Sequence, residues 1–147
     1  MKRNTVFGVT GFAVLTLIFL SAFKPAPGDH PLYIRALGDL RSARWSLEHK
    51  PGNWKRTTDE LNAVGEIDKA INEIKKSHID DGHDNNWDPR VKELGDHIGR
   101  LHAAADFLHK AHEDIKDEDM KWENGLKQRT LQHIDAAIAN TEKAIRQ

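Results

Sequence analysis

The chain has 147 residues, of which 38% are hydrophobic, 31% charged and 7% aromatic. This length allows one domain of ordinary size, and so polar a composition excludes an integral membrane bundle. The 22 Lys and Arg residues are balanced by 23 Asp and Glu residues. The chain therefore lacks the excess of positive charge that is typical of nucleic-acid-binding proteins. The absence of cysteine excludes disulfides, thiolate catalysis and cysteine-ligated metal sites.

The first residues have the pattern of an export segment. Lys2 and Arg3 are positively charged, and residues 6–23 follow without a single charged side chain. No clean small-x-small cleavage site follows, and the apolar stretch is at the lower length limit for a membrane span. We therefore expect residues 1–26 to act as a cleaved signal peptide or, alternatively, as an anchor in the cytoplasmic membrane. Either alternative places the rest of the chain in the periplasm or outside the cell.

Residues 27–147 are expected to form one domain of four helices. A cap followed by Pro31, together with the stop signal at residues 50–52, predicts a first helix over residues 31–49. Thr57 and Glu60 have the spacing of a capping box, which predicts the start of a second helix that ends near His78.

The second half of this domain carries two further helix starts. Asp88 and Pro89 predict the beginning of a third helix, and the pair at residues 124–125 precedes a fourth that runs almost to Gln147. In all four segments apolar residues recur every three or four positions. The predicted core comprises Tyr33, Leu37, Leu40, Leu47, Leu61, Val64, Ile67, Ile71, Ile74, Leu94, Ile98, Leu101, Ala105, Leu108, Ile115, Leu126, Leu131, Ile134, Ile138 and Ile145.

The two halves of the domain resemble each other. Residues 37–40 match residues 98–101 at a shift of 61, and residues 67–71 match residues 134–138 at a shift of 67. A single αα-hairpin cannot bury its apolar face alone, whereas two packed together can. The sequence therefore predicts an all-α, up-down-up-down four-helix bundle built from two similar αα-hairpins. The alternative is a chance match between amphipathic helices of the same period.

The first predicted helix also carries a family resemblance. The stretch His30-Pro31-Leu32-Tyr33, followed by residues 37–45 and by Leu47-Glu48-His49, resembles small exported bacterial helical proteins that have no assigned activity. The likeness covers most of the chain after the export segment. It implies a bacterial, extracytoplasmic setting and a helical fold, and it carries no functional residue to this chain.

A stripe of possible metal ligands lies on the third helix. His102, Asp106, His109 and Glu113 follow one another at i, i+4, i+7 and i+11, which places them on one flank. Imidazole and carboxylate ligands on facing helices of a bundle can bind a divalent transition metal. The alternative, which we prefer, is that these residues form ordinary surface pairs and that the protein holds no cofactor.

The four tryptophans are candidates for an interaction surface. Trp54, Trp87 and Trp122 fall in predicted connections, and Trp45 lies away from the main apolar stripe of the first helix. In an up-down-up-down bundle the first and third connections share one end, so we expect Trp54 and Trp122 to lie together there. These tryptophans either close the ends of the core or contact a protein partner.

The chain contains no motif typical of a serine hydrolase, a phosphate-binding loop, a zinc protease or a dinucleotide-binding turn. We therefore predict a non-enzyme that acts as an extracytoplasmic interaction or envelope-support module. The alternative functions are a His/carboxylate metal carrier or buffer and a bundle that binds an apolar ligand between its hairpins. Contact with a membrane is expected only through an uncleaved N-terminal segment, and no nucleic-acid partner is expected.

Overall fold

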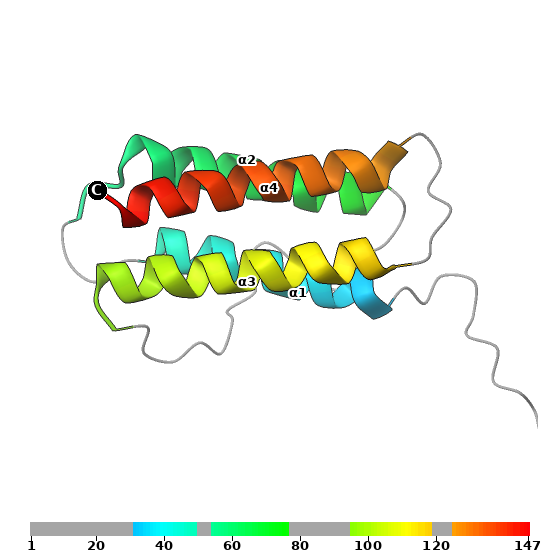
Figure 1. Ribbon diagram of the computed structural model, residues 1–147, viewed down its shortest axis with the longest axis horizontal. Coiled ribbons are helices and arrows are strands. Elements are labelled where there is room, and N and C mark those ends of the chain that lie inside the picture. The colour runs from blue at the N-terminus through cyan, green and yellow to red at the C-terminus, as the bar shows by residue number, and fades with distance from the viewer. Residues whose placement is uncertain (1–30, 50–53, 77–94, 119–124) are drawn as a thin grey trace, which may run out of the picture.

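The computed structural model describes residues 31–49, 54–76, 95–118 and 125–147. These residues form four α-helices, α1 (Pro31–Glu48), α2 (Thr58–Lys76), α3 (His97–Asp117) and α4 (Leu126–Ile145), and no strand (Figure 1). The prediction of an all-α four-helix bundle is thus confirmed for the described residues. The predicted export segment, Leu94, Trp87 and Trp122 lie outside them. No helix in the described ranges is long and apolar enough to cross a membrane.

Local signals set most of the helix ends. The backbone N–H of Thr57 donates to Glu60 Oε2 at 2.6 Å, and the N–H of Glu60 donates to Thr57 Oγ1 at 3.2 Å, which confirms the capping box. The third helix begins at His97 in the described residues, where Asp96 caps it by accepting from the N–H of Gly99 at 2.8 Å, and the predicted start at Pro89 lies outside them.

The order of the helices in space differs from the predicted one. Arg35 of α1 contacts Asp114 near the end of α3 at 2.9 Å, and Arg129 near the start of α4 contacts Glu73 near the end of α2 at 2.9 Å. These contacts make α1 antiparallel to α3, and α2 antiparallel to α4. The first helix is also antiparallel to α2 (Figure 1). The bundle is therefore up-down-down-up, and the predicted up-down-up-down order is wrong.

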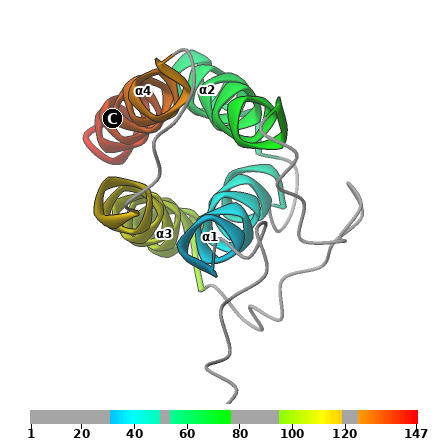
Figure 2. The ribbon, with the colours of Figure 1, turned by 90° about the vertical axis from the view of Figure 1, so that its right-hand side faces the viewer.

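The end-on view shows the same arrangement, with α2 beside α4, α1 beside α3, and α2 and α3 on a diagonal (Figure 2). Because α2 and α3 are parallel, the end of α2 and the start of α3 lie at opposite ends of the bundle. A helix as long as α2 spans about 28 Å, whereas the twenty or so residues of the connection reach roughly 65 Å when extended. The chain is thus long enough for the crossover, and periodicity alone does not reveal it.

The core follows the predicted apolar stripes except at two helix starts. Leu40, Ile67, Leu108 and Ile134 are fully buried. The exceptions are Leu61 and Ile98, which stay 50% and 43% exposed, because each belongs to the first turn of its helix at one end of the bundle. Fully buried alanines, which the analysis of the large apolar residues did not include, bring the helices close together: Ala36, Ala43, Ala63, Ala70, Ala104, Ala111 and Ala137.

Buried positions repeat between the two halves at a nearly constant shift. Seven of the eight buried residues of α3 lie 68 positions after a buried residue of α1, as Leu108 follows Leu40. Four of the five buried residues of α4 lie 67 positions after a buried residue of α2, as Ile134 follows Ile67. The shift of 61 predicted for the first and third helices is therefore wrong by seven residues. Two helical turns preserve the apolar face, so the sequence pattern hides this error.

Polar contacts repeat in the same way. Arg44 Nε of α1 lies 3.0 Å from Asp68 Oδ1 of α2, and His112 Nε2 of α3 lies 3.3 Å from Asp135 Oδ1 of α4. The second pair follows the first at the shifts that the buried residues show. Because equivalent helices pack antiparallel, the two hairpins are related by an approximate two-fold axis perpendicular to the bundle.

Candidate functional site

The starts of α2 and α3 are joined by a buried contact across the bundle diagonal. Oε1 of Glu60 contacts Nε2 of His97, and Oε2 of Glu60 accepts from the N–H of Thr57. Glu60 is only 2% exposed. One carboxylate therefore caps α2 and also holds the first turn of α3 in place.

A buried guanidinium accompanies this carboxylate. Arg100, in the first turn of α3, is 4% exposed, and its Nε and Nη1 have no hydrogen-bond partner in the part of the chain that the structure describes. Burial lowers the pKa of this guanidinium, and the negative charge of Glu60 acts in the opposite direction. The charge of Glu60 thus offsets only part of the cost of burying Arg100 at this end of the bundle.

Exposed apolar side chains belong to the same end of the bundle. The ring of Trp54 packs on the ring of His97, with centroids 4.3 Å apart and planes inclined by 34°. Trp54 is 49% exposed, and the similarly exposed Leu61 and Ile98 follow Glu60 and His97 directly in the sequence. We call Trp54, Leu61 and Ile98 the apolar end. These three side chains carry no group that titrates near neutral pH or acts as a nucleophile.

The other predicted tryptophans do not join this surface in the described structure. Trp45 is half-buried and stacks on His49, with centroids 4.6 Å apart. Trp87 and Trp122 lie outside the described residues. The end of α3 and the start of α4, between which Trp122 stands in the sequence, lie at the opposite end of the bundle from the start of α2, which follows Trp54 in the sequence (Figure 1). The topology that placed these two tryptophans together is therefore not the one observed.

The predicted metal ligands are exposed along α3. His102 and Asp106 face solvent, His109 Nε2 lies 4.0 Å from Glu142 Oε1 of α4, and Glu113 Oε2 lies 3.4 Å from Lys116 Nζ. Lys116 lowers the pKa of Glu113. Within the described ranges no three His, Asp or Glu side chains are grouped so as to hold a metal ion. The contacts that His109 and Glu113 make are those of surface pairs.

The sequence analysis gave His97 no role and assigned Glu60 only to the cap. The contact between them joins residues 37 positions apart, on helices that stand diagonally. Local spacing carries no signal for such a pair, because it depends on the relative direction of α2 and α3. His97 lies eight residues after the predicted helix start at Pro89, so only the tertiary structure places it at a helix start and pairs it with Glu60.

Comparisons with family models, with curated proteins and with solved structures found no match to this chain.

Proposed function

We propose that this protein is an exported, non-catalytic interaction module of the cell envelope that binds a protein partner through the apolar end. One observation carries the proposal: a half-exposed Trp54 is packed on His97, which is itself held by the buried Glu60. Exposed tryptophans on a rigid support are frequent binding hot spots, because little side-chain entropy is lost when they are covered.

The polar groups beside the apolar end support this interpretation over catalysis. Both oxygens of Glu60 already contact the protein, one at His97 and one at the N–H of Thr57. A carboxylate held in this way organises two helix starts and is not positioned to exchange protons with a substrate. The extracytoplasmic setting rests on the composition of residues 1–26 and on the resemblance of the first helix to exported bacterial proteins.

Site-specific photocrosslinking tests the partner. A photoreactive amino acid replaces Leu61 in the full chain, which is expressed in bacterial cells. Illumination should then crosslink the chain to one defined partner protein. Replacing Trp54 and Ile98 by Ser in the same chain should abolish that product, whereas Ile34→Ser should not. Ile34 is a matched control, since it is 38% exposed and lies at the start of α1, at the opposite end. Equal crosslinking in both variants would contradict the proposal.

Cell fractionation with intact-mass measurement tests export. The full chain should appear outside the cytoplasm, either shortened near residue 26 or intact in the membrane fraction. An intact chain confined to the cytoplasm would overturn the proposed location and leave the crosslinking result to be judged by itself.

A further inference from the structure

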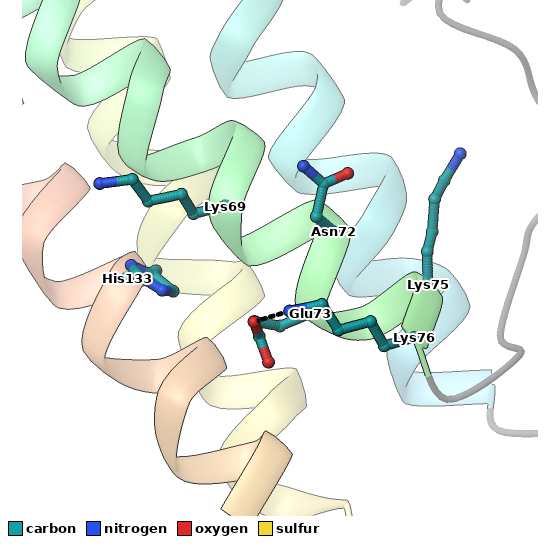
Figure 3. A pocket seen from close by; sticks show the side chains of 6 residues that line it. All are labelled: Lys69, Asn72, Glu73, Lys75, Lys76 and His133. Atoms are coloured by element: carbon teal, nitrogen blue, oxygen red, sulfur yellow. Dashed lines mark hydrogen bonds and ion pairs between the residues drawn. The ribbon is translucent and has the colours of Figure 1, made fainter.

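An open groove of about 550 Å³ lies on the outer surface of α2 and α4, away from the apolar end. Most of its wall comes from the second half of α2, and a histidine of α4 completes it (Figure 3). All but one of its side chains carry a nitrogen that can donate a hydrogen bond. The lining residues are Lys69, Asn72, Glu73, Lys75, Lys76 and His133.

The two carboxylates of this surface are each held by two nitrogen donors. Glu73 contacts Lys76 Nζ and, at 2.9 Å, Arg129 Nε. Glu66, beside the groove, contacts Lys69 Nζ at 2.6 Å and His133 Nδ1 at 2.7 Å. Hydrogen bonding from the lysine in each group lowers the pKa of both carboxyls.

Among the residues that the structure describes, this surface carries more cationic side chains than carboxylates. Lys69, Lys75, Lys76 and Arg129 are four permanent cations, against the two carboxylates of Glu66 and Glu73. An ammonium group has three N–H donors, so Lys69 and Lys76 can keep their carboxylate contacts and still donate to a ligand. Their side chains are 58% and 60% exposed, which leaves them accessible from the groove.

The approximate two-fold axis supplies an internal comparison for these charges. The equivalent surface, 67 positions further on, keeps only one of the three lysines, with Lys143 in the place of Lys76. Alanines replace Lys69 and Asn72, and an acid replaces Lys75. Helix packing therefore does not require lysine at positions 69 and 75. The equivalent residues are Ala136, Ala139, Asn140, Glu142 and Lys143, with Glu66 in the place of His133.

We propose that this groove binds a small phosphate or sulfate ester through its oxyanion. The lysines supply charge to the tetrahedral oxyanion, and the amide of Asn72 and Nε2 of His133 supply directional contacts. The groove volume is in the range of small-ligand sites, which is about 300–1,000 Å³. This site is separate from the apolar end and does not depend on the function proposed for it.

Titration followed by NMR tests the site on the full chain in a non-ionic detergent, with glucose 6-phosphate, glucose 6-sulfate and glucose as probes. At least one ester should give saturable shifts at the side chains of Asn72 and His133, whereas glucose should give none. The ester that binds more tightly identifies the source of the oxyanion. Shifts that do not saturate, or that spread over lysines outside the groove, would overturn the proposal.

Two variants and a matched control localise the binding. Asn72→Asp places a negative charge in the groove on an exposed side chain, and Lys69→Gln with Lys76→Gln removes two cations. Each should weaken ester binding at least about tenfold. Lys143→Gln changes the position equivalent to Lys76 and should leave the affinity unchanged. Circular dichroism verifies that the variants are folded, and an equal loss in the Lys143→Gln control would contradict the site.

Discussion

His133 Nδ1 lies 2.7 Å from Glu66 Oε2, and these two residues occupy the same position in the two halves of the chain. Contact between equivalent positions is expected only where a two-fold axis passes. The axis that relates the two hairpins therefore runs between α2 and α4 at this pair. The protein is arranged like two hairpins packed face to face, with each helix against its own counterpart.

The Glu66 contacts predict a pH-dependent contribution to stability. Because Lys69 and, to a smaller extent, His133 lower the pKa of Glu66 from 4.5, the ionised form is favoured in the folded state. The stabilisation is complete above pH 4.5 and is lost as the pH falls through the lowered folded-state pKa. Glu66→Gln should therefore reduce the urea midpoint at pH 7 and not at pH 2.

The exposed Asp106, on the solvent face of α3, provides the control as Asp106→Asn. That change should leave the midpoint nearly unaltered at both pH values, because an exposed side chain contributes little. A loss in Glu66→Gln that is equal at pH 7 and pH 2 would refute an ionic origin.

Asp114 should act in the opposite direction. Burial raises its pKa from 3.8, and its Oδ2 has no hydrogen-bond partner in the described part of the chain. Ionisation therefore opposes folding at pH values above the raised pKa, and this cost disappears as the pH falls to 3.8 and below. Asp114→Asn should unfold at a higher temperature than the parent chain at pH 7, and the difference should vanish in acid.

Differential scanning calorimetry at several pH values measures the unfolding temperatures of Asp114→Asn and of the parent chain. A lower unfolding temperature for Asp114→Asn at pH 7 would show that the contact with Arg35 outweighs the cost of burial. The same scans on Arg35→Gln measure the contribution of that contact to stability. We expect this contribution to be small because the arginine side chain is 67% exposed.

The exposure of the apolar residues predicts two very different costs. Leu40 is completely buried, so Leu40→Ala should cost about 2–5 kcal/mol through lost burial and the cavity left behind. Leu61 occupies an apolar position of the same periodic pattern but is 50% exposed, so Leu61→Ala should change stability by less than roughly 0.5 kcal/mol. Urea unfolding of both variants measures the two losses of stability. Similar losses would contradict the exposed position of Leu61 in the first turn of α2.

The helix order can be measured directly, because the chain has no cysteine to interfere with labelling. Spin labels on cysteines replacing the exposed Thr58 and Gly95 should be roughly 20 Å apart, since α2 and α3 begin at the same end. Labels replacing Thr58 and Gln128 should also be roughly 20 Å apart, because α2 and α4 are antiparallel and the Glu66–His133 contact places Gln128 beside Ile71, 13 residues along α2 from Thr58. In an up-down-up-down bundle the first distance would be the longer one.

Some elements of the site could be predicted from local spacing and others could not. The capping box of Thr57 and Glu60 involves residues three positions apart, so the sequence alone located it correctly. The partnership of Glu60 with His97 required the direction of α3, which was predicted incorrectly. The cationic groove was also missed, because its lysines on α2 and His133 on α4 are adjacent only after folding.

The sequence by itself determined the four helices of the described residues, most of their ends and the residues of their apolar faces, because caps and stripes depend on neighbours within one or two turns. The tertiary structure alone decided which helices are neighbours, which charged groups pair and which half of the bundle carries the groove. An apolar stripe is buried equally well against any helix of the same period. The choice among such packings therefore depends on small alanines, interhelical ion pairs and the length of one connection, all of which act between residues far apart in the chain.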